Sequence, residues 1–198
     1  MKILIASGNA GKLKELQAML GPLGIEAVPQ SQFNVADAEE PHHTFLENAL
    51  VKARHASRAT GLPALADDSG LCVDVLEGEP GVQSAYYAGH EGDRPQRDQR
   101  NNQRLVQALR SQADRSAYYY CVLVLVHSPT DPTPLVADGR WNGEMLLEPR
   151  GEGGFGYDPH FLPRGSLLTA AQMPPGEKNR VSHRAQALAA LAARLRTA

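Results

Sequence analysis

The sequence predicts an α/β fold from the pattern of its opening segment. Lys2–Ala6 has the length and apolar character of a short buried strand, and the polar, glycine-containing loop Ser7–Lys12 follows it. Gly11–Leu20 repeats leucine at helical spacing, and Ile25–Val28 has the character of a second strand. A strand, a glycine loop, a helix and another strand form the beginning of a βαβ unit, which favours an α/β class.

The remaining elements follow from hydrophobic periodicity and turn signals along the chain. Further helices are expected at Thr44–Thr60, Arg97–Ser111 and Arg184–Arg196. Further strands are expected at Ala64–Ala66, Leu71–Leu76, Ala117–His127 and within Leu135–Leu147, the last interrupted at Asn142-Gly143. The first two of these strands flank Asp67–Gly70, and Gly89–Arg100 is polar enough to form a mobile loop. Without a repeat or a long linker, residues 1–198 are expected to form one domain, which two closely packed lobes could make up.

Composition and charge indicate the class of protein and exclude several partners. Hydrophobic residues make up 42% of the chain and charged residues 21%, as in an ordinary globular protein. The formal charge of −2 provides no basic surface for a nucleic-acid polymer or an anionic membrane, so a small-molecule substrate is expected. The longest apolar run, Ala117–Val126, is too short to span a bilayer, and the chain opens without a secretory signal. Cys72 and Cys121 lie in apolar, strand-like segments, which indicates buried free thiols and a cytoplasmic location.

The loop Ser7–Lys12 is the first candidate for a binding site. A glycine-containing turn at a helix N-terminus presents backbone N–H groups and the positive end of the helix dipole to a phosphate. Lys12 adds a positive charge one turn into the helix. The loop does not match a Walker A motif, because Ala6 and Leu13 occupy positions that require glycine and Ser/Thr. Taken alone, a simple strand-to-helix turn explains the loop equally well.

A second glycine-rich segment, Gly151–Gly156, matches G-x-G-x-x-G but does not indicate a dinucleotide site. Pro159 follows closely and would disrupt the helix that such a site needs. The segment does place an aromatic ring, Phe155, beside the carboxylate of Asp158. Stacking of a base on Phe155 is the functional interpretation, and packing in the core is the alternative.

Two pairs of acidic residues are candidates for a magnesium site. Glu39-Glu40 lies in an acidic loop, and Asp67-Asp68 follows an apolar strand. In phosphoryl chemistry, Mg²⁺ is typically bound by one or two carboxylates together with phosphates of the substrate. The glutamates alone would fit a solvated loop, whereas burying adjacent aspartates beside a strand requires partners for their charges.

The last candidates, Lys178 and Ser182-His183-Arg184, precede the C-terminal helix. The guanidinium of arginine carries only hydrogen-bond donors, arranged as a planar fork, and therefore suits a carbonyl oxygen or a phosphate. Alternatively, Ser182 caps the helix, His183 is structural and Arg184 lies on the surface. The remaining histidines and the two cysteines show no spacing of a zinc site, and no signature of a covalent nucleophile is present.

Five blocks along the whole chain together resemble the inosine/xanthosine triphosphate pyrophosphatase family. In order they are Ser7-Gly8-Asn9-Ala10-Gly11-Lys12, Phe45-x-Glu47-Asn48-Ala49-x-x-Lys52-Ala53, Ala66-Asp67-Asp68-Ser69-Gly70-Leu71, Gly154-Phe155-Gly156-Tyr157-Asp158-Pro159 and Glu177-Lys178-Asn179-x-x-Ser182-His183-Arg184. The resemblance implies an elongated mixed twisted sheet with flanking helices, and two lobes around a central nucleotide-binding cleft. It also implies a homodimer that hydrolyses ITP, dITP and XTP to the monophosphate and pyrophosphate and so cleanses the nucleotide pool.

The resemblance also assigns roles to single residues. Glu40 and Asp68 would bind Mg²⁺, and Asp68 would draw the proton from the attacking water. The triphosphate would contact Ser7, Gly8, Asn9, Ala10, Gly11, Lys12 and Lys52. The rest of the nucleotide would contact Ser69, Phe155, Gly156, Tyr157, Asp158, Lys178, His183 and Arg184. We expect Arg184 and backbone N–H groups near Phe155 to read the 6-oxo group of the purine, which would exclude ATP.

Two positions depart from the family pattern: Ser7 stands where Thr is common, and Tyr86 stands where many bacterial relatives carry Arg. Two other functions compete with the hydrolase. A nucleotide-binding module without turnover would have no use for Asp68. A related pyrophosphatase acting on pyrimidine or methylated nucleotides would not explain the blocks around Phe155 and Arg184.

Overall fold

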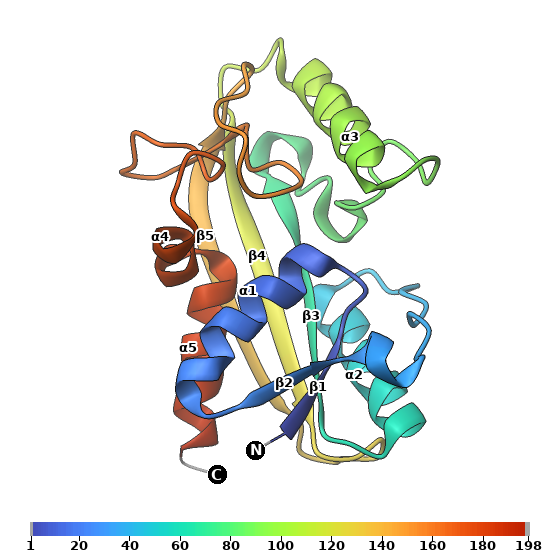
Figure 1. The fold of residues 1–198 in the computed structure, drawn as a ribbon. Coiled ribbons are helices and arrows are strands. Elements are labelled where there is room, and N and C mark those ends of the chain that lie inside the picture. Colours follow the sequence, from blue (N-terminus) through green and yellow to red (C-terminus); the bar gives the residue numbers. More distant parts are fainter. Residues whose placement is uncertain (1, 197–198) are drawn as a thin grey trace. The chain divides into compact units, whose positions relative to one another are not determined.

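The computed structural model describes residues 2–196 and confirms the α/β class. Its strands are β1 (Lys2–Ala6), β2 (Glu26–Pro29), β3 (Ala64–Val73), β4 (Ser116–Val126), β5 (Leu135–Met145) and β6 (Phe161–Pro163). They form a sheet in the order β2-β1-β3-β4-β5-β6 (Figure 1). The sheet is mixed, because β1 pairs in parallel with β2 and β3, while β5 and β6 are antiparallel. The α-helices are α1 (Ala10–Leu20), α2 (Phe45–Thr60), α3 (Arg94–Leu109), α4 (Pro175–Val181) and α5 (His183–Leu195).

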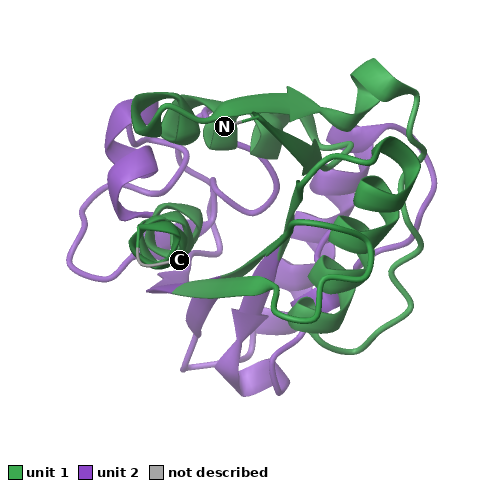
Figure 2. Ribbon diagram, turned by 90° about the horizontal axis from the view of Figure 1, so that it is seen from below, with its two compact units in different colours: residues 1–68, 121–139, 183–198 green, residues 69–120, 140–182 purple. Residues whose placement is uncertain are grey.

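The chain divides into two compact units (Figure 2). Unit 1 comprises Met1–Asp68, Cys121–Gly139 and His183–Ala198, and unit 2 comprises Ser69–Tyr120 and Arg140–Ser182. The phosphate-loop and metal candidates therefore belong to unit 1, and Ser69, Phe155–Asp158 and Lys178 belong to unit 2.

In unit 1, the alternation of side chains along the strands separates two faces of the sheet. Ile5, Leu65 and Leu123 belong to a core cluster that also contains residues of α1 and α5. The intervening residues face the opposite side, where α2 lies (Figure 1). Consecutive residues of β3 therefore point to different helices, which matters for Asp67 and Asp68.

In unit 2, the core combines aromatic rings with aliphatic side chains. The ring of Phe161 meets Tyr119 edge-on at 4.7 Å and lies 5.3 Å from Trp141, measured between ring centres. Helix α3 adds Leu105 and Leu109 to the same cluster. Edge-to-face pairs of this kind add to the stabilisation that burial of the rings provides.

Two predicted breaks in strands are absent. The segment Asp67–Gly70 is part of a continuous β3, because the two carboxylates find cationic partners and need no exposed turn. Likewise, Asn142-Gly143 does not interrupt β5. Gly143 pairs with Pro163 of β6, and a Cβ at this position would overlap the Leu162 carbonyl oxygen and the Phe161 ring. The glycine therefore permits close pairing of strands rather than a turn.

The prediction of a mobile loop at Gly89–Arg100 was wrong from Arg94 onward, because these residues belong to α3. Helix α3 begins at Arg94 because Asp93 and Gln96 form a capping box, in which each side chain bonds to the other residue's backbone N–H. The predicted strand Leu71–Leu76 is wrong at its end, because β3 stops at Val73 and Asp74–Leu76 forms a 3-10 helix. The other predicted boundaries agree with the structure to within about two residues, the usual uncertainty at element ends.

Two further expectations concern the chain as a whole. Cys72 and Cys121 are both buried free thiols, as predicted. Within residues 2–196, none of the helices combines the length and the apolar character that crossing a bilayer requires.

Candidate functional site

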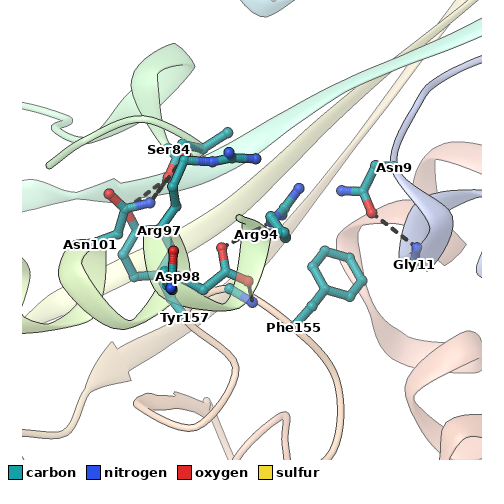
Figure 3. A network of polar contacts seen from close by, with 12 residues as sticks. Asn9, Gly11, Ser84, Arg94, Arg97, Asp98, Asn101, Phe155 and Tyr157 are labelled. Atoms are coloured by element: carbon teal, nitrogen blue, oxygen red, sulfur yellow. Dashed lines mark hydrogen bonds and ion pairs between the residues drawn. The ribbon is translucent and has the colours of Figure 1, made fainter. Parts of the chain in front are cut away.

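The loop Ser7–Lys12 leads from β1 into α1 and largely satisfies its own backbone. The side-chain oxygen of Asn9 caps α1 by accepting hydrogen bonds from the N–H groups of Gly11, at 3.0 Å, and Lys12, at 3.3 Å (Figure 3). The Ser7 hydroxyl accepts another from the Asn9 N–H at 3.2 Å. These bonds hold the loop in one conformation, in which the helix start is already capped. A phosphate at this position would gain positive charge mainly from Lys12 and the helix dipole.

Lys12 contacts a buried carboxylate rather than open solvent. Its ammonium lies 2.6 Å from Asp67 Oδ1, and Asp67 is completely buried. The other oxygen of Asp67 accepts hydrogen bonds from Arg184 Nε at 2.7 Å and from the Cys121 thiol at 3.2 Å. Arg184 also donates to Glu15 on α1. Asp67 is therefore the centre of a buried polar cluster that joins α1, β3, β4 and α5.

Electrostatics fixes the charge state of this cluster. Burial opposes ionisation of Asp67, but the attraction of Arg184 and Lys12 outweighs it and holds the pKa of the carboxyl well below its usual range. Burial and the negative charge of Asp67 raise the pKa of the Cys121 thiol well above its usual value. The cluster therefore favours the ionised carboxylate of Asp67 and the neutral thiol of Cys121.

Asp68 points to the opposite face of β3 and belongs to a second cluster. Lys52 of α2 donates hydrogen bonds to Asp68 Oδ1 and to Glu40 Oε2, each at 2.8 Å. Three of the predicted residues therefore lie together, with the ammonium between the two carboxylates. Attraction by Lys52 overcomes the effect of burial and lowers the pKa of Glu40.

The free oxygen of Asp68 is the most informative feature of this cluster. Oδ2 is buried and has no hydrogen-bond partner among the described residues. Burial raises the pKa of Asp68 to about 6, and the attraction of Lys52 and Lys12 offsets this effect only in part. A buried carboxylate oxygen without a partner is costly, which indicates that a proton, a water molecule or a cation completes the site.

Asp68 and Glu40 also fit a divalent cation. Two neighbouring carboxylates are the protein ligands that Mg²⁺ typically uses when substrate phosphates and water complete its coordination. Within residues 2–196, no group of three acidic, histidine or cysteine side chains is arranged to hold a metal alone. A cation at this position would therefore depend on phosphate ligands.

Two further predicted residues flank these clusters. Ser69 follows Asp68 in β3 and is half-buried. His183 is buried at the start of α5. Its backbone carbonyl packs so closely against Gly139 that a Cβ there would overlap it. Close contact between β5 and α5 therefore fixes the position at which His183 and Arg184 enter the helix.

In unit 2, Phe155, Asp158 and Lys178 form a compact group. Asp158 Oδ2 accepts hydrogen bonds from the Phe155 N–H at 2.9 Å and from the Lys178 ammonium at 2.7 Å. The same ammonium lies 4.9 Å from the centre of the Phe155 ring, at the distance of a cation–π contact. Tyr157 is buried and donates its hydroxyl hydrogen bond to the Ser84 carbonyl at 2.9 Å. The Tyr157 hydroxyl is thus already paired within the protein. Phe155 is only half-buried and keeps part of its surface accessible to a ligand.

Several residues around these groups were missed from the sequence. Glu15 lies three residues after Lys12 on α1, a helical spacing that could have revealed it. Arg94 lies in the segment expected to be a loop, and Asp98 lies where that segment overlaps the expected helix Arg97–Ser111. The capping pair Asp93 and Gln96 was a readable sign that the helix begins before Arg97. The partners of Asp67 gave no local signal, because Arg184 is distant in sequence.

Comparison with known proteins assigns this chain to a family. The Ham1 family model matches residues 3–194. The dITP/XTP pyrophosphatase of Nitrosomonas europaea is 60% identical over 190 residues, which cover 96% of this chain and 92% of the relative. The dITP/XTP pyrophosphatase of Chromobacterium violaceum is 60% identical over 195 residues, 98% of this chain and 97% of the relative.

Solved structures agree with the sequence relatives. A HAM1 protein from Coxiella burnetii matches with a TM-score of 0.90 and 47% identity over the full length of both chains. A nucleoside-triphosphatase / dITP/XTP pyrophosphatase from Mycobacterium abscessus matches with a TM-score of 0.73 and 45% identity, covering 96% of this chain and 98% of that one. These matches confirm the relationship inferred from the five sequence blocks, and the chain belongs to the Ham1 family.

Proposed function

We propose that the chain hydrolyses non-standard purine nucleoside triphosphates, dITP, ITP and XTP, to the monophosphate and pyrophosphate. The observation that carries this proposal is the buried oxygen of Asp68 beside Glu40 and Lys52, which has no hydrogen-bond partner within residues 2–196. The names of relatives at about 60% identity over nearly the whole chain support the choice of substrate.

In the proposed reaction, the oxygen of water bonds to the α-phosphorus while the bond to the oxygen bridging the α- and β-phosphates breaks. Asp68 accepts the proton of the water, and pyrophosphate leaves. A carboxylate with a pKa of about 6 is well suited to this step, because it is ionised near neutral pH and is more basic than an ordinary aspartate. Lys12 and Lys52 would stabilise the negative charge on the phosphates.

Glu40 and Asp68 are the proposed ligands of Mg²⁺, with phosphate oxygens of the substrate as further ligands. When bound, the ion would neutralise charge on the triphosphate. Lys52 would keep the two carboxylates near each other before substrate arrives, since it bridges them in the structure.

The remaining predicted residues would bind the rest of the nucleotide. Phe155 would provide an apolar surface for the base, and the backbone around it would contact the edge of the base. Lys178 would support this surface through Asp158. The assignment of Arg184 to the 6-oxo group remains a prediction, and in the structure its guanidinium is occupied by Asp67 and Glu15.

A binding module without turnover is the main alternative, and the Asp68 cluster argues against it. A protein that only binds nucleotides gains nothing from a carboxyl group kept buried with an unpaired oxygen.

We also propose that the chain forms a homodimer in the cytoplasm, as the family resemblance implies. Light scattering coupled to gel filtration measures the molar mass and so tests the homodimer directly.

A pyrophosphate-release assay tests the proposed function. The panel contains dITP, ITP, XTP, GTP, ATP and one pyrimidine triphosphate, each with Mg²⁺ and with a chelator. We expect Mg²⁺-dependent release from the first three and little from ATP. Absence of release from every triphosphate would refute the proposal, and faster release from the pyrimidine than from dITP would favour a different pyrophosphatase.

A further inference from the structure

The backbone of Gly156 is held by two side chains of α3. Asp98 Oδ2 accepts a hydrogen bond from the Gly156 N–H at 3.0 Å, and Asn102 Nδ2 donates one to the Gly156 carbonyl at 2.9 Å. Asp98 and Asn102 are one helical turn apart and therefore project from the same face of α3. Both backbone polar groups of Gly156 are thus bound by one helix.

This arrangement fixes the residue that follows Phe155. Gly156 has a φ of +64°, in the left-handed region that glycine adopts readily. On the other side, the Phe155 N–H is held by Asp158, which in turn is held by Lys178. Hydrogen bonds therefore restrain the backbone both at Phe155 and immediately after it, which fixes the point and direction from which the side chain of Phe155 leaves the backbone.

Asp98 has a second contact near the same ring. Its Oδ1 lies 2.9 Å from Arg94 Nε, and the guanidinium carbon of Arg94 lies 5.8 Å from the centre of the Phe155 ring. Figure 3 shows Arg94 between Asp98 and Phe155. One carboxylate therefore positions both the loop that carries the ring and a cation beside the ring.

We propose that Asp98 and Asn102 are positioning residues for the base, acting through the Gly156 peptide on Phe155. The inference rests on the proposed function, since it requires that Phe155 contacts a purine base. Segment 151–156 contains four glycines, and such a chain loses much conformational entropy when it becomes ordered. A loop that α3 has already ordered avoids that loss on binding, so removing either side chain weakens binding of the base.

Binding of inosine monophosphate and of inorganic pyrophosphate, measured by calorimetry, separates the base from the phosphates. We expect Asp98→Ala and Asn102→Ala each to weaken inosine monophosphate binding roughly 5- to 30-fold, the effect of losing one well-formed hydrogen bond to a site. Pyrophosphate binding should stay within about twofold of wild type. Asp98→Asn keeps an acceptor oxygen for the Gly156 N–H and should restore most of the affinity.

Gln103→Ala is the matched control for Asn102→Ala. It removes an amide from the adjacent, exposed position of the same helix and should leave both affinities unchanged. Asn102→Ala also serves as the second variant if Asp98→Ala folds poorly. Unchanged inosine monophosphate affinity in the folded variants would overturn the inference.

A double-mutant cycle with Phe155→Ala shows whether the two residues act through the ring. In the Phe155→Ala background, Asp98→Ala and Asn102→Ala should change inosine monophosphate affinity less than twofold. The full loss in that background, or an equal loss of pyrophosphate affinity, would show an effect on the fold and contradict the inference. The release assay on wild type tests the proposed function separately. If wild type releases pyrophosphate from dITP but the variants bind inosine monophosphate normally, only the inference about Asp98 and Asn102 fails.

Discussion

At the scale of single residues, the alternation of a β-strand gives Asp67 and Asp68 different electrostatic environments. Asp67 faces Lys12 and Arg184, and its two oxygens are fully paired with cations and a thiol. Asp68 forms its ion pair with Lys52, and its other oxygen has no hydrogen-bond partner among the described residues. The first carboxylate is thus suited to holding other side chains, and the second to accepting a proton or a cation.

Lys12→Ala is expected to raise KM for dITP and to make binding less sensitive to salt, because the lysine contributes charge toward phosphate. Asp67 keeps Arg184 as a partner in this variant, so the fold should remain intact. Inosine monophosphate should bind almost as before if Lys12 faces the departing pyrophosphate. Steady-state kinetics at two salt concentrations provide the measurement, and Lys14→Ala, at an exposed position of the same helix, is the control. Equal weakening of both ligands would instead place Lys12 near the α-phosphate.

Arg184→Ala tests two roles of one side chain. Because it leaves buried Asp67 and Glu15 without their shared cation, the free energy of unfolding should fall by about 3–5 kcal/mol, as in other broken buried ion pairs. Urea denaturation measures this loss. The ratio of kcat/KM for ITP and ATP measures base reading in the same variant. A smaller ratio of kcat/KM for ITP to that for ATP would support the contact with the 6-oxo group. An equal fall of kcat/KM for both substrates would show that Arg184 does not read the base and has a structural role.

At the scale of elements, the packing of β5 against α5 depends on a residue without a side chain. At Gly139, a Cβ would overlap the His183 carbonyl oxygen and the Ala187 backbone nitrogen. Both atoms belong to the first turns of α5, and moving them would displace His183 and Arg184. Close approach of strand and helix is therefore a condition for the buried cluster around Asp67.

Gly139→Ala should lower the free energy of unfolding by about 1–3 kcal/mol, the usual cost of overpacking a core. Gly176→Ala, in α4, is the control, because a Cβ there has open space and the helix favours alanine over glycine. Thermal melting of both variants provides the measurement. A melting temperature for Gly139→Ala equal to that of wild type would show that α5 can shift without cost.

The sequence predicted local elements well and tertiary pairing poorly. The helices α1, α2 and α5 and the strand β1 follow from apolar spacing, which is a property of neighbouring residues. The continuity of β3 through Asp67 and Asp68 could not be predicted, because its cause is Lys12, Lys52 and Arg184, which lie elsewhere in the chain. The start of α3 was predictable from its capping box and was missed because the segment is highly polar.

At the scale of the whole molecule, the raised pKa of Asp68 makes the stability of the fold depend on pH. Burial raises the pKa of Asp68 to about 6 in the folded protein, from an ordinary value of 3.8. Well below pH 3.8 the carboxyl is protonated in both the folded and unfolded states and has no effect. As the pH rises through 4 to 6, the unfolded state ionises first, so the folded state loses relative stability, and above 6 the loss is complete. A shift of about two units corresponds to a loss of up to about 3 kcal/mol.

Asp68→Asn should therefore melt at a higher temperature than wild type at pH 7.5 in the presence of a chelator. The difference should shrink as the pH falls through 6 and vanish well below pH 3.8. Glu39→Gln, at an exposed position in the neighbouring acidic loop, is the control and should show no such difference. Melting curves across this pH range would contradict the account if the difference between Asp68→Asn and wild type did not depend on pH.

Turnover of dITP by wild type and by Asp68→Asn tests most directly whether Asp68 accepts the proton of the water that attacks the triphosphate. Product analysis after incubation with dITP and Mg²⁺ should show one monophosphate for each pyrophosphate in wild type. In the variant, kcat should fall by at least about 10²–10⁴-fold, the usual effect of losing a general base, while binding of dITP remains measurable. Near-normal turnover of Asp68→Asn, or release of orthophosphate in place of pyrophosphate by wild type, would contradict the account.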